Sequence, residues 1–335
     1  MTTALLNRNN PIDTLRGFAC ILLVAYHVIG ITPDNGLHVQ EGVLKDANAL
    51  LVYIRMPIFT FLSGYVYAQR PFSSDWKKFI SGKIRRLIIP MLFVGTLFAL
   101  LQTITPGTNA AVIDWRFLHL MPVAHYWFIE SLFLIFLTII PLEHFKLLRN
   151  KTSFAIIYLL AVTLYVTNAG IPWFSIAGAF YLFPYFLIGL YCARFPLLIK
   201  NQKTIGYLLI TGIALFLLFF GQQYGGERRS LNALLIGSIF CIGLLFIKIE
   251  SRFLSKIGIY SYAIYLFHVF FTAGSRIFFV KTGITEIWVL FILGTTLGLS
   301  GPILIERIAS KYNPARILLL GKRPRESKVV ASGTS

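Results

Sequence analysis

The stretch IDTLRGFACILLVAYHVIG, residues 12–30, decides the class of fold that this chain can adopt. Its apolar run is close to the roughly 20 residues that a helix needs to cross a bilayer. Yet Arg16 stands near its start and His27 lies inside it. Ionisable side chains within a membrane span are costly and are usually kept for a function. The stretch therefore predicts a membrane span that carries part of a functional site.

The composition extends this prediction to the whole chain. Of 335 residues, 56% are hydrophobic and 13% are charged, whereas soluble domains carry about 25% charged residues. The mean hydropathy is +0.73. No small-residue cleavage site follows a short apolar core at the N-terminus, so we expect the first span to be retained. We predict an all-α, polytopic membrane bundle over residues 1–310, followed by a basic, disordered cytoplasmic tail over residues 311–335.

Ten apolar stretches are long enough to be candidate spans. Several contain Pro or Gly, which a membrane bundle tolerates where neighbouring helices satisfy the freed backbone groups. The candidates are residues 15–33, 48–68, 86–105, 124–142, 153–169, 172–192, 204–221, 231–248, 257–279 and 285–307.

The basic residues predict the orientation of these spans. With the N-terminus inside, 24 of the 31 Lys and Arg residues fall in inner segments and 5 in outer segments. The remaining two, Arg55 and Arg276, fall within spans. This asymmetry favours ten spans with both termini in the cytoplasm. It also accounts for most of the net charge of +18, so the partner that the charge indicates is the lipid bilayer and not nucleic acid.

The spacing of Arg16 and His27 predicts where each side chain lies. Eleven residues of helix rise by about 16–17 Å, so His27 lies near the midplane if Arg16 marks the cytoplasmic face. Eleven residues are also close to three turns, which puts both side chains on nearly one stripe. His27 either forms a hydrogen bond to a neighbouring helix for packing, or acts as a general base, for which imidazole is well matched near pH 7.

The segment KIRRLIIP, residues 83–90, places Lys83, Arg85 and Arg86 at the inner edge of the third span. These cations are either ordinary positive-inside signals or ligands for the phosphates of a cytosolic acyl carrier. In the second span, Ser63 and Gly64 form a small pair, typical of close helix packing. Ser63 is also a candidate to hydrogen-bond a ligand.

Two further ionisable residues lie within spans. Glu130 in HYWFIESLF is expected to pair with a cation such as Arg55, to orient His27, or to stay protonated. His268 in SYAIYLFHVFF shares a helix face with two tyrosines three and six residues before it. His268 is either an interior imidazole whose hydrogen bonds are satisfied, or a second residue of the functional site of His27.

Together these motifs resemble the membrane acyltransferase family 3, bacterial enzymes that O-acylate envelope polysaccharides. The resemblance covers residues 12–310. Its motifs are the D-x-L-R-G opening with Arg16 and His27, the F-x-x-x-S-G segment with Ser63 and Gly64, the basic-x-x-Arg element of Lys83 and Arg86 before Pro90, the W-F segment at Trp127, and the Tyr-x-x-His pattern ending at His268. The terminal Glu-Arg-Pro signature is matched by Glu306 and Arg307, but its Pro is displaced to Pro314. The match at Glu306 is therefore weaker than the matches of the other motifs.

The resemblance implies a stand-alone enzyme of the bacterial inner membrane. The donor would be a cytoplasmic acyl-CoA, most often acetyl-CoA, with succinyl-transferring relatives leaving the acyl group open. The acceptor would be a sugar hydroxyl of a polysaccharide or lipid-linked glycan. No metal is required, and the three cysteines lie singly in apolar runs without metal-ligand spacing.

The resemblance and the spacing give a hypothesis for the site. Arg16, Lys83, Arg85 and Arg86 would hold the CoA phosphates at the inner face, with Ser63 as a further donor contact. The pantetheine arm would run upward between the first and third spans. His27 would deprotonate the acceptor hydroxyl or become acylated itself. Glu130 and His268 would orient His27 or relay its proton.

Two other classes of function fit a ten-span bundle. Buried His, Glu and Arg residues also occur in transporters and proton-coupled flippases, which commonly show internal repeats. No such repeat is visible here, and the charges cluster at the inner ends. A polysaccharide polymerase or ligase would usually have a larger outer loop than the segments near 34–47 and 106–123.

Overall fold

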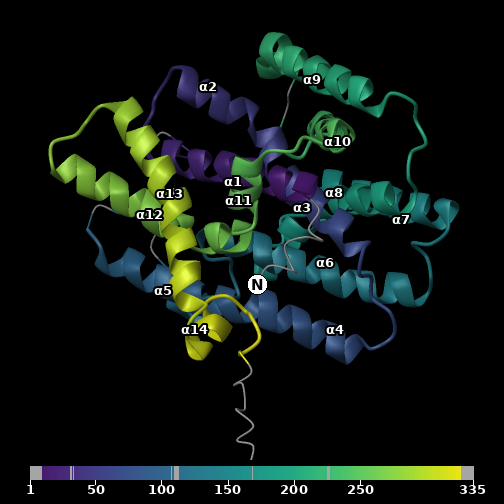
Figure 1. The fold of residues 1–335 in the computed structure, drawn as a ribbon, viewed down its shortest axis with the longest axis horizontal. Helices are drawn as coiled ribbons and strands as arrows, with labels where there is room; N and C mark the ends of the chain where they lie inside the picture. The colour runs from purple at the N-terminus through teal and green to yellow at the C-terminus, as the bar shows by residue number, and fades with distance from the viewer. Residues whose placement is uncertain are drawn as a thin grey trace, which may run out of the picture.

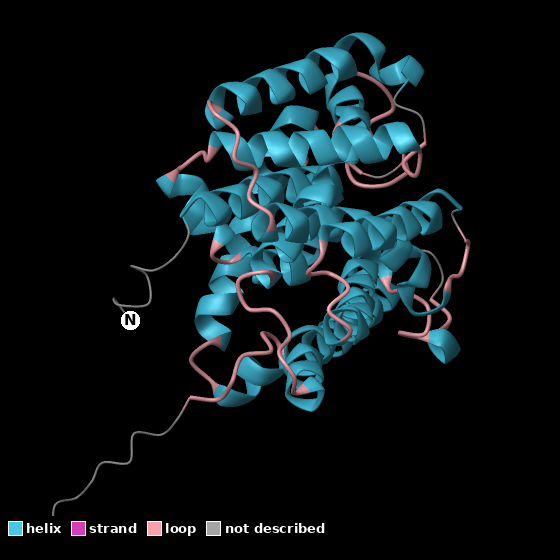
Figure 2. Cartoon of the chain, turned by 90° about the vertical axis from the view of Figure 1, so that its right-hand side faces the viewer, coloured by secondary structure: helices cyan, strands magenta, loops and turns pink. Residues whose placement is uncertain are grey.

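The structure, a computed structural model, describes residues 10–325 apart from 31, 33, 107, 109–112, 168, 225 and 226. Within these residues the chain is helical, with one isolated β-bridge and no strand (Figures 1 and 2). The predicted tail residues 326–335 lie outside the described residues. The α-helices are α1 (Asn10–Ile29), α2 (Val43–Leu50), α3 (Val52–Tyr67), α4 (Trp76–Lys83), α5 (Ile89–Ile104), α6 (Trp127–His144), α7 (Lys151–Thr167), α8 (Ile176–Arg194), α9 (Gln202–Tyr224), α10 (Leu231–Ile247), α11 (Arg252–Gly258), α12 (Ser261–Lys281), α13 (Ile287–Ala309) and α14 (Asn313–Leu318).

The predicted membrane bundle is confirmed. Seven helical stretches of the described chain are long and apolar enough to cross a membrane, and an eighth is the pair α2–α3, which is bent by 43°. Two shorter apolar helices, α7 and α10, have 17 residues each and fall on the predicted fifth and eighth spans. Each predicted span thus overlaps an apolar helix or bent pair. The count of ten crossings and the cytoplasmic placement of both termini stay predictions of the sequence.

The first helix ends earlier than predicted. The sequence placed the first span at 15–33, whereas α1 ends at Ile29 because Gly30 has a φ of 110° that stops the helix. The backbone beyond Gly30 forms a connection to α2 with a further left-handed residue at Gly36, φ 57°. The space beyond the C-terminal end of α1 is therefore lined by loops and by parts of the longer helices.

A π-helical turn, Ile84–Ile88, joins α4 to α5 at the predicted basic motif. The N–H of Ile89 bonds to the carbonyl of Ile84, five residues back. Pro90 has no N–H to offer the carbonyl of Arg86, its i−4 residue, and its ring would crowd that carbonyl in an α-helix. The hydroxyl of Tyr262 on α12 donates to the Arg86 carbonyl instead, at 2.5 Å. The proline thus explains why the helix widens where the cations stand.

Close helix crossings hold the bundle together. α1 packs against α3, α11, α12 and α13 (Figure 1). Where α3 meets α8, a Cβ on Gly64 would lie 2.0 Å from the Phe186 carbonyl oxygen, and a Cβ on Gly189 would lie 2.0 Å from that of Phe61. Only glycine permits this backbone approach. Gly64 therefore has the packing role that its small side chain predicted.

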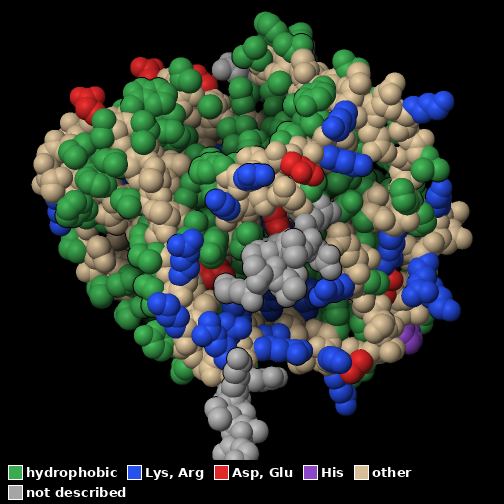
Figure 3. Space-filling view, viewed as in Figure 1, with side chains coloured by type: hydrophobic (Ala, Val, Ile, Leu, Met, Phe, Trp, Pro, Cys, Tyr) green, Lys and Arg blue, Asp and Glu red, His purple; other side chains and the backbone are tan. Residues whose placement is uncertain are grey.

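The helix ends that the sequence assigns to the inner side meet one another. Arg194 at the end of α8 pairs with Glu143 at the end of α6, and Arg85 donates to the carbonyl of Gly321 beyond α14. On the face seen in Figure 3, Lys and Arg side chains gather in the lower half, over the region of α4 and α14. The bundle therefore has one strongly basic end.

The chain stays folded beyond residue 310. Residues 311–325, which the sequence assigns to the tail, include α14 and a return segment over the basic end. Leu320 is 2% exposed and joins the largest core cluster. The burial of Leu320 explains why residues 311–325 are folded, because a purely basic segment would have no apolar surface to bury.

Candidate active site

Three histidines from distant parts of the chain meet inside the bundle. The ring centroids of His27 and His268 are 4.8 Å apart, those of His125 and His268 are 4.9 Å apart, and those of His27 and His125 are 5.7 Å apart. His27 lies in the last turn of α1 and His268 lies on α12. His125 belongs to a short 3₁₀ turn, Ala124–Tyr126, before α6. The sequence singled out His27 and His268 but missed His125.

The position of this cluster along the bundle can be judged from α13. A Cβ on Gly298 would lie 2.6 Å from the Val24 side chain, and a Cβ on Gly294 would lie 3.1 Å from that of Val28. His27 stands between these two valines, so it lies beside the middle of the 23-residue helix α13. The depth of His27 in a membrane stays a prediction of the sequence.

Contacts to α12 hold His125 in place. The Tyr265 hydroxyl donates to the His125 carbonyl, and the Tyr126 hydroxyl donates to the Leu266 carbonyl at 2.8 Å. The preceding residue, Ala124, has a φ of 45°, an uncommon conformation for a residue with a side chain. The sequence signal for His125 was weak, because a histidine at the predicted outer edge of a span is unremarkable. Only the inward course of this segment brings the imidazole to His27.

The hydrogen bonds of His268 define its tautomer. Its Nδ1 lies 2.8 Å from the Ile264 carbonyl and 2.9 Å from the Tyr265 carbonyl, and carbonyls only accept, so Nδ1 carries the proton. Its Nε2 is then an acceptor. Among the residues that the structure describes, this Nε2 and both ring nitrogens of His125 are buried without a hydrogen-bond partner. Buried polar atoms of this kind are rare unless a substrate or water satisfies them.

A cavity of about 750 Å³ opens from this cluster. Such a volume falls in the range of roughly 300–1,000 Å³ that is typical of small-molecule sites. His27 and His125 line it, and its walls come from parts of α5, α12 and α13 and from the loops before α2 and α6. The histidines therefore stand at the inner end of a cavity that opens away from the basic end, on the side that the sequence predicts to be outside; we call it the outer cavity.

Arg55 supports the wall beside His27. Its guanidinium lies 3.8 Å from the centroid of the Tyr26 ring and donates to the side-chain oxygen of Asn48 and, at 2.9 Å, to its carbonyl. Asn48 in turn donates to the Gly30 carbonyl at 2.8 Å, at the end of α1. The predicted pairing of Arg55 with Glu130 is not seen, because Asn48 takes both guanidinium contacts.

The charges around the cavity are mostly positive. Arg55, Arg228 and Arg276 line it, together with one carboxylate, Asp114. Asp114 lies in the outer loop, and the guanidinium of Arg116, which donates to it at 2.9 and 3.0 Å, lowers the pKa of its carboxyl. The cavity thus offers guanidinium donors and aromatic faces to whatever enters it.

The predicted donor-binding cations lie at the basic end, but they differ in their surroundings. Arg86 is exposed, while Lys83 is half-buried with its Nζ 3.2 Å from the centroid of the Phe136 ring. Arg85 is half-buried and donates to the Gly321 carbonyl at 2.6 Å. On α1, Arg16 pairs with Asp13 at 3.3 Å. Their role in binding a donor stays a prediction.

Two other predicted site residues have partners away from the histidines. Glu130 is 6% exposed and accepts a hydrogen bond from Ser175, next to α8. Ser63 donates to the Phe59 carbonyl of its own helix at 2.8 Å. Neither lines the main cavity. Glu130 and Ser63 are therefore not brought together with His27, and their predicted roles are untested.

No group of three His, Cys, Asp or Glu side chains within the described residues is arranged to hold a metal ion. The three imidazoles instead provide acceptors and donors at one place, packed edge against face. Such an arrangement can take a proton from a hydroxyl and pass it on.

The structure thus defines a polytopic membrane protein in which three histidines lie together at the end of a cavity. The family model described as an acyltransferase domain matches residues 9–307. The chain therefore belongs to the membrane acyltransferase family 3.

Curated relatives align with nearly the whole chain. Glucans biosynthesis protein C from Escherichia coli strain SMS-3-5 is 22% identical over 372 aligned positions, covering 93% of this chain and 94% of the relative. The protein of the same name from E. coli O157:H7 strain EC4115 is 23% identical over 373 positions with the same coverage. No solved structure matches the chain.

Proposed function

We propose that this acyltransferase moves an acyl group from a cytoplasmic acyl-CoA, most often acetyl-CoA, to a sugar hydroxyl that enters from the outer side. The observation that carries the proposal is the position of the histidine cluster, at the inner end of the outer cavity and beside the middle of α13. A thioester from one side and a hydroxyl from the other would meet there. The relatives' name supports a glucan as the acceptor.

The chemistry needs one base and one path for a proton. In direct transfer, His27 takes the hydroxyl proton, the hydroxyl oxygen forms the new C–O bond, and the C–S bond of the thioester breaks. The proton then goes to the leaving CoA thiolate. In the two-step alternative, His27 attacks the thioester carbon and the C–S bond breaks, releasing the CoA thiolate. The acceptor hydroxyl then attacks the acyl carbon, the C–N bond to His27 breaks, and the hydroxyl proton goes to the thiolate. His268, with Nδ1 held by its own helix and Nε2 free to accept, fits the role of a partner that orients His27 or receives its proton.

The donor would be held at the basic end. Arg16, Lys83 and Arg86 are the cations proposed to meet the phosphates of CoA, and guanidinium groups suit phosphate because their donors form a planar fork. Whether the enzyme transfers an acetyl or a succinyl group depends on the size of the space between these cations and His27. The bacterial inner membrane is the proposed location, since a donor in the cytoplasm and an acceptor outside require a membrane between them.

The test is acyl transfer in membranes that contain the full-length chain. Radiolabelled acetyl-CoA and succinyl-CoA are supplied with glucan acceptors, and His27→Ala is compared with wild type. His144→Ala is the matched control, because His144 is exposed at the end of α6, away from the cavity. We expect label in the glycan with wild type and with His144→Ala only. Full transfer by His27→Ala would contradict the proposed mechanism, and no transfer from either donor by wild type would contradict the proposed reaction.

A further inference from the structure

A second, smaller cavity of about 250 Å³ adjoins the main one. The two cavities share Pro122, Trp127 and Arg228 in their walls. The remaining wall of the second cavity comes from the start of α8 and from Arg229. Arg228, Trp127 and Pro122 are therefore a common boundary, and a ligand long enough to pass them would occupy both spaces.

The lining of the second cavity suits a sugar ring. The guanidinium carbon of Arg228 lies 5.5 Å from the centroid of the Trp127 ring and 4.8 Å from that of Tyr181. An aromatic ring offers a flat apolar face, and a guanidinium offers several donors in one plane. A sugar has the matching surfaces, with C–H groups on its faces and hydroxyls around its edge. The volume is below the range for drug-sized ligands and is suited to one ring.

The backbone beside this cavity is strained. Phe174 and Ser175 are consecutive non-glycine residues with φ of 51° and 53°. This conformation lets the Ser175 hydroxyl donate to Glu130 while the Ser131 hydroxyl donates to the Ser175 carbonyl at 3.0 Å. The second carboxylate oxygen of Glu130 is buried without a partner among the described residues. Strain of this kind is kept where surrounding structure enforces it, most often at functional sites.

We propose that the second cavity binds the sugar unit next to the one that is acylated. This rests on the proposed function, and it makes the acceptor an oligosaccharide or polysaccharide rather than a single sugar. Trp127 and Arg228 contact both units at the boundary. Glu130 is then a positioning residue, which holds Ser175 in the wall of this subsite rather than acting on His27.

The test compares acceptors of increasing length. Purified full-length protein in nanodiscs is given acetyl-CoA or succinyl-CoA, whichever is active, with glucose and with glucan oligomers of two to six units. Wild type is expected to show kcat/KM about tenfold higher for oligomers than for glucose, in line with the loss of one pocket contact. Ala177→Leu, which narrows only the second cavity, is expected to remove this advantage while leaving transfer to glucose unchanged.

The controls separate this proposal from the function itself. Ala273→Leu narrows only the main cavity and should lower transfer to every acceptor alike. If Ala177→Leu does not fold, Arg229→Gln tests the same wall. Equal kcat/KM for glucose and oligomers in wild type, or an equal loss on all acceptors with Ala177→Leu, would overturn the subsite. No transfer by wild type to any glycan would instead contradict the proposed function.

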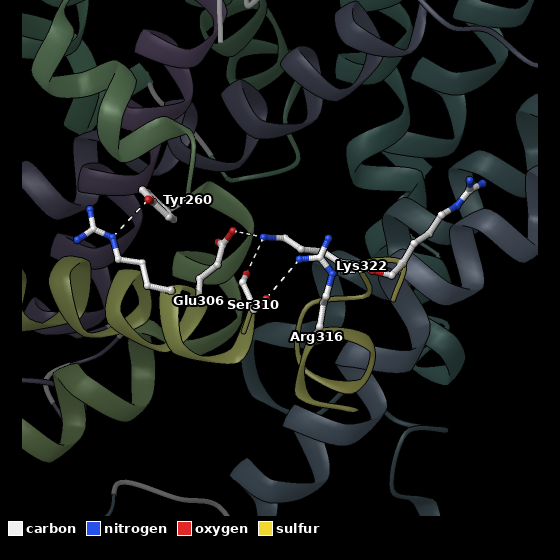
Figure 4. Close-up of polar contacts among 7 residues, drawn as sticks. Tyr260, Glu306, Ser310, Arg316 and Lys322 are labelled. Atoms are coloured by element: carbon white, nitrogen blue, oxygen red, sulfur yellow. Dashed lines mark hydrogen bonds and ion pairs between the residues drawn. The ribbon is translucent and has the colours of Figure 1, made fainter. Parts of the chain in front are cut away.

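A separate observation concerns the segment that follows α13. The side chain of Lys322 donates to Glu306 at 2.5 Å and to Ser310 at 3.2 Å, and Arg316 donates to the Arg323 carbonyl at 2.6 Å (Figure 4). The Lys322 contacts tie the return segment to the end of α13, whereas the Arg316 contact lies within the segment itself. Glu306, the weakest part of the family resemblance, therefore has a defined partner.

The return segment also touches the π-helical turn that carries the basic motif. Gly321 has a φ of 58°, and a Cβ there would lie 2.5 Å from the Arg85 carbonyl oxygen and 2.7 Å from the Arg86 Cα. The Arg85 guanidinium donates to the Gly321 carbonyl at 2.6 Å. On its other side, the same turn is held by Tyr262 through the Arg86 carbonyl. The turn is thus fixed from two directions.

We infer that residues 313–322 are a strap that positions Lys83 and Arg86 for the CoA phosphates. In this arrangement Arg85 is a positioning residue whose guanidinium is used by the strap. The inference rests on the proposed donor site but not on the second cavity. It predicts that loosening the strap weakens donor binding and leaves the histidine chemistry unchanged.

The test is equilibrium binding of CoA to the full-length protein in nanodiscs, together with KM and kcat for acyl-CoA. Gly321→Ala is expected to weaken CoA binding and raise the donor KM about tenfold, as for loss of a charged hydrogen bond, with kcat unchanged. Gly283→Ala is the matched control, because Gly283 has a φ of 90° but open space around it. Gly283→Ala places a side chain at a positive φ without the collision.

The outcomes distinguish the strap from the donor site itself. Weaker binding with Gly321→Ala alone supports the strap. Unchanged binding with Gly321→Ala, or equal weakening by Gly283→Ala, would overturn it. If Gly321→Ala does not fold, Lys322→Gln is used, with the exchange of charges in Glu306→Lys plus Lys322→Glu expected to restore binding. Failure of wild type to bind CoA would contradict the proposed function instead.

Discussion

The outer cavity and the basic inner end are built in different ways. Three imidazoles meet at the cavity from residues 27, 125 and 268, and His125 belongs to a short 3₁₀ turn rather than to a long helix. The cations of the inner end come largely from one short stretch, Lys83–Arg86, on a continuous helical segment. Proton transfer needs atoms placed to within hydrogen-bond distance, whereas attraction of a phosphate needs only charge nearby. This difference predicts that changes in the cavity act on kcat and changes at the inner end act on donor KM.

The largest effect is expected for His27→Ala. Removing a general base typically lowers kcat by about 10²- to 10⁴-fold. Binding of CoA should be retained, because His27 lies about 16–17 Å along α1 from Arg16. Transfer assays and CoA titration on the same nanodisc sample measure both quantities. Loss of CoA binding along with activity would break the proposed division between the two regions.

The next effect concerns the histidine that the sequence did not reveal. His125→Ala is expected to lower kcat by about 10²-fold, because its ring is one of the two that face His27. His119→Ala serves as control, since His119 lies in the same loop and hydrogen-bonds with Thr96 rather than with the cluster. Burial lowers the pKa of His119, so it is neutral at pH 7 and its loss removes no charge. Unchanged kcat in His125→Ala would show that, of the three histidines, only His27 and His268 are candidates for a catalytic role.

Smaller effects are expected at the inner end. Arg86→Ala should raise the donor KM by about tenfold with little change in kcat, as for the loss of one charged hydrogen bond. The exposed position of Arg86 makes this contribution sensitive to salt, so KM in wild type should also rise between low and physiological ionic strength. A fall in kcat with constant KM would mean that Arg86 acts on the reacting atoms. It would contradict the prediction that changes at the inner end act on the donor KM.

The smallest effect is expected in the outer loop. Arg116 lowers the pKa of the exposed Asp114 carboxyl, so Arg116→Gln should return it toward the ordinary value of about 3.9. The carboxyl is ionised at pH 7 in both proteins, so transfer at pH 7 should be unchanged. A pH profile of transfer between pH 4 and 8 checks this. A large loss at pH 7 would show that Arg116 itself contacts the acceptor.

Much of the architecture was readable from the sequence. Each of the ten predicted spans coincides with an apolar helix or the bent pair, because hydrophobic length is a local property of the chain. The placement of Arg16 and His27 on one helix was also predicted correctly, and helical rise fixes their separation. The predicted helix ends were less accurate. The first span was predicted to reach residue 33, whereas α1 ends at Ile29 because Gly30 has a positive φ.

The composition of the site was only partly readable. His27 and His268 were found because a histidine within an apolar helix stands out. His125 was missed because its importance depends on a loop that turns inward, which no local pattern encodes. For Glu130 the sequence left open a cation partner, a role in orienting His27 or a protonated carboxyl, and it did not indicate the hydrogen bond from Ser175. Side-chain partners of this kind depend on how helices rotate and cross, which hydropathy does not specify.

The sequence by itself determined that this chain spans a membrane many times, that its basic residues favour one side, and which family its motifs resemble. Those properties follow from composition, length and spacing along the chain. Only the tertiary structure decided that three imidazoles converge, that a cavity opens from them away from the basic end, and that residues 313–322 return to the π-helical turn. Each of these joins segments more than 90 residues apart, and such contacts arise from packing shape rather than from any local pattern.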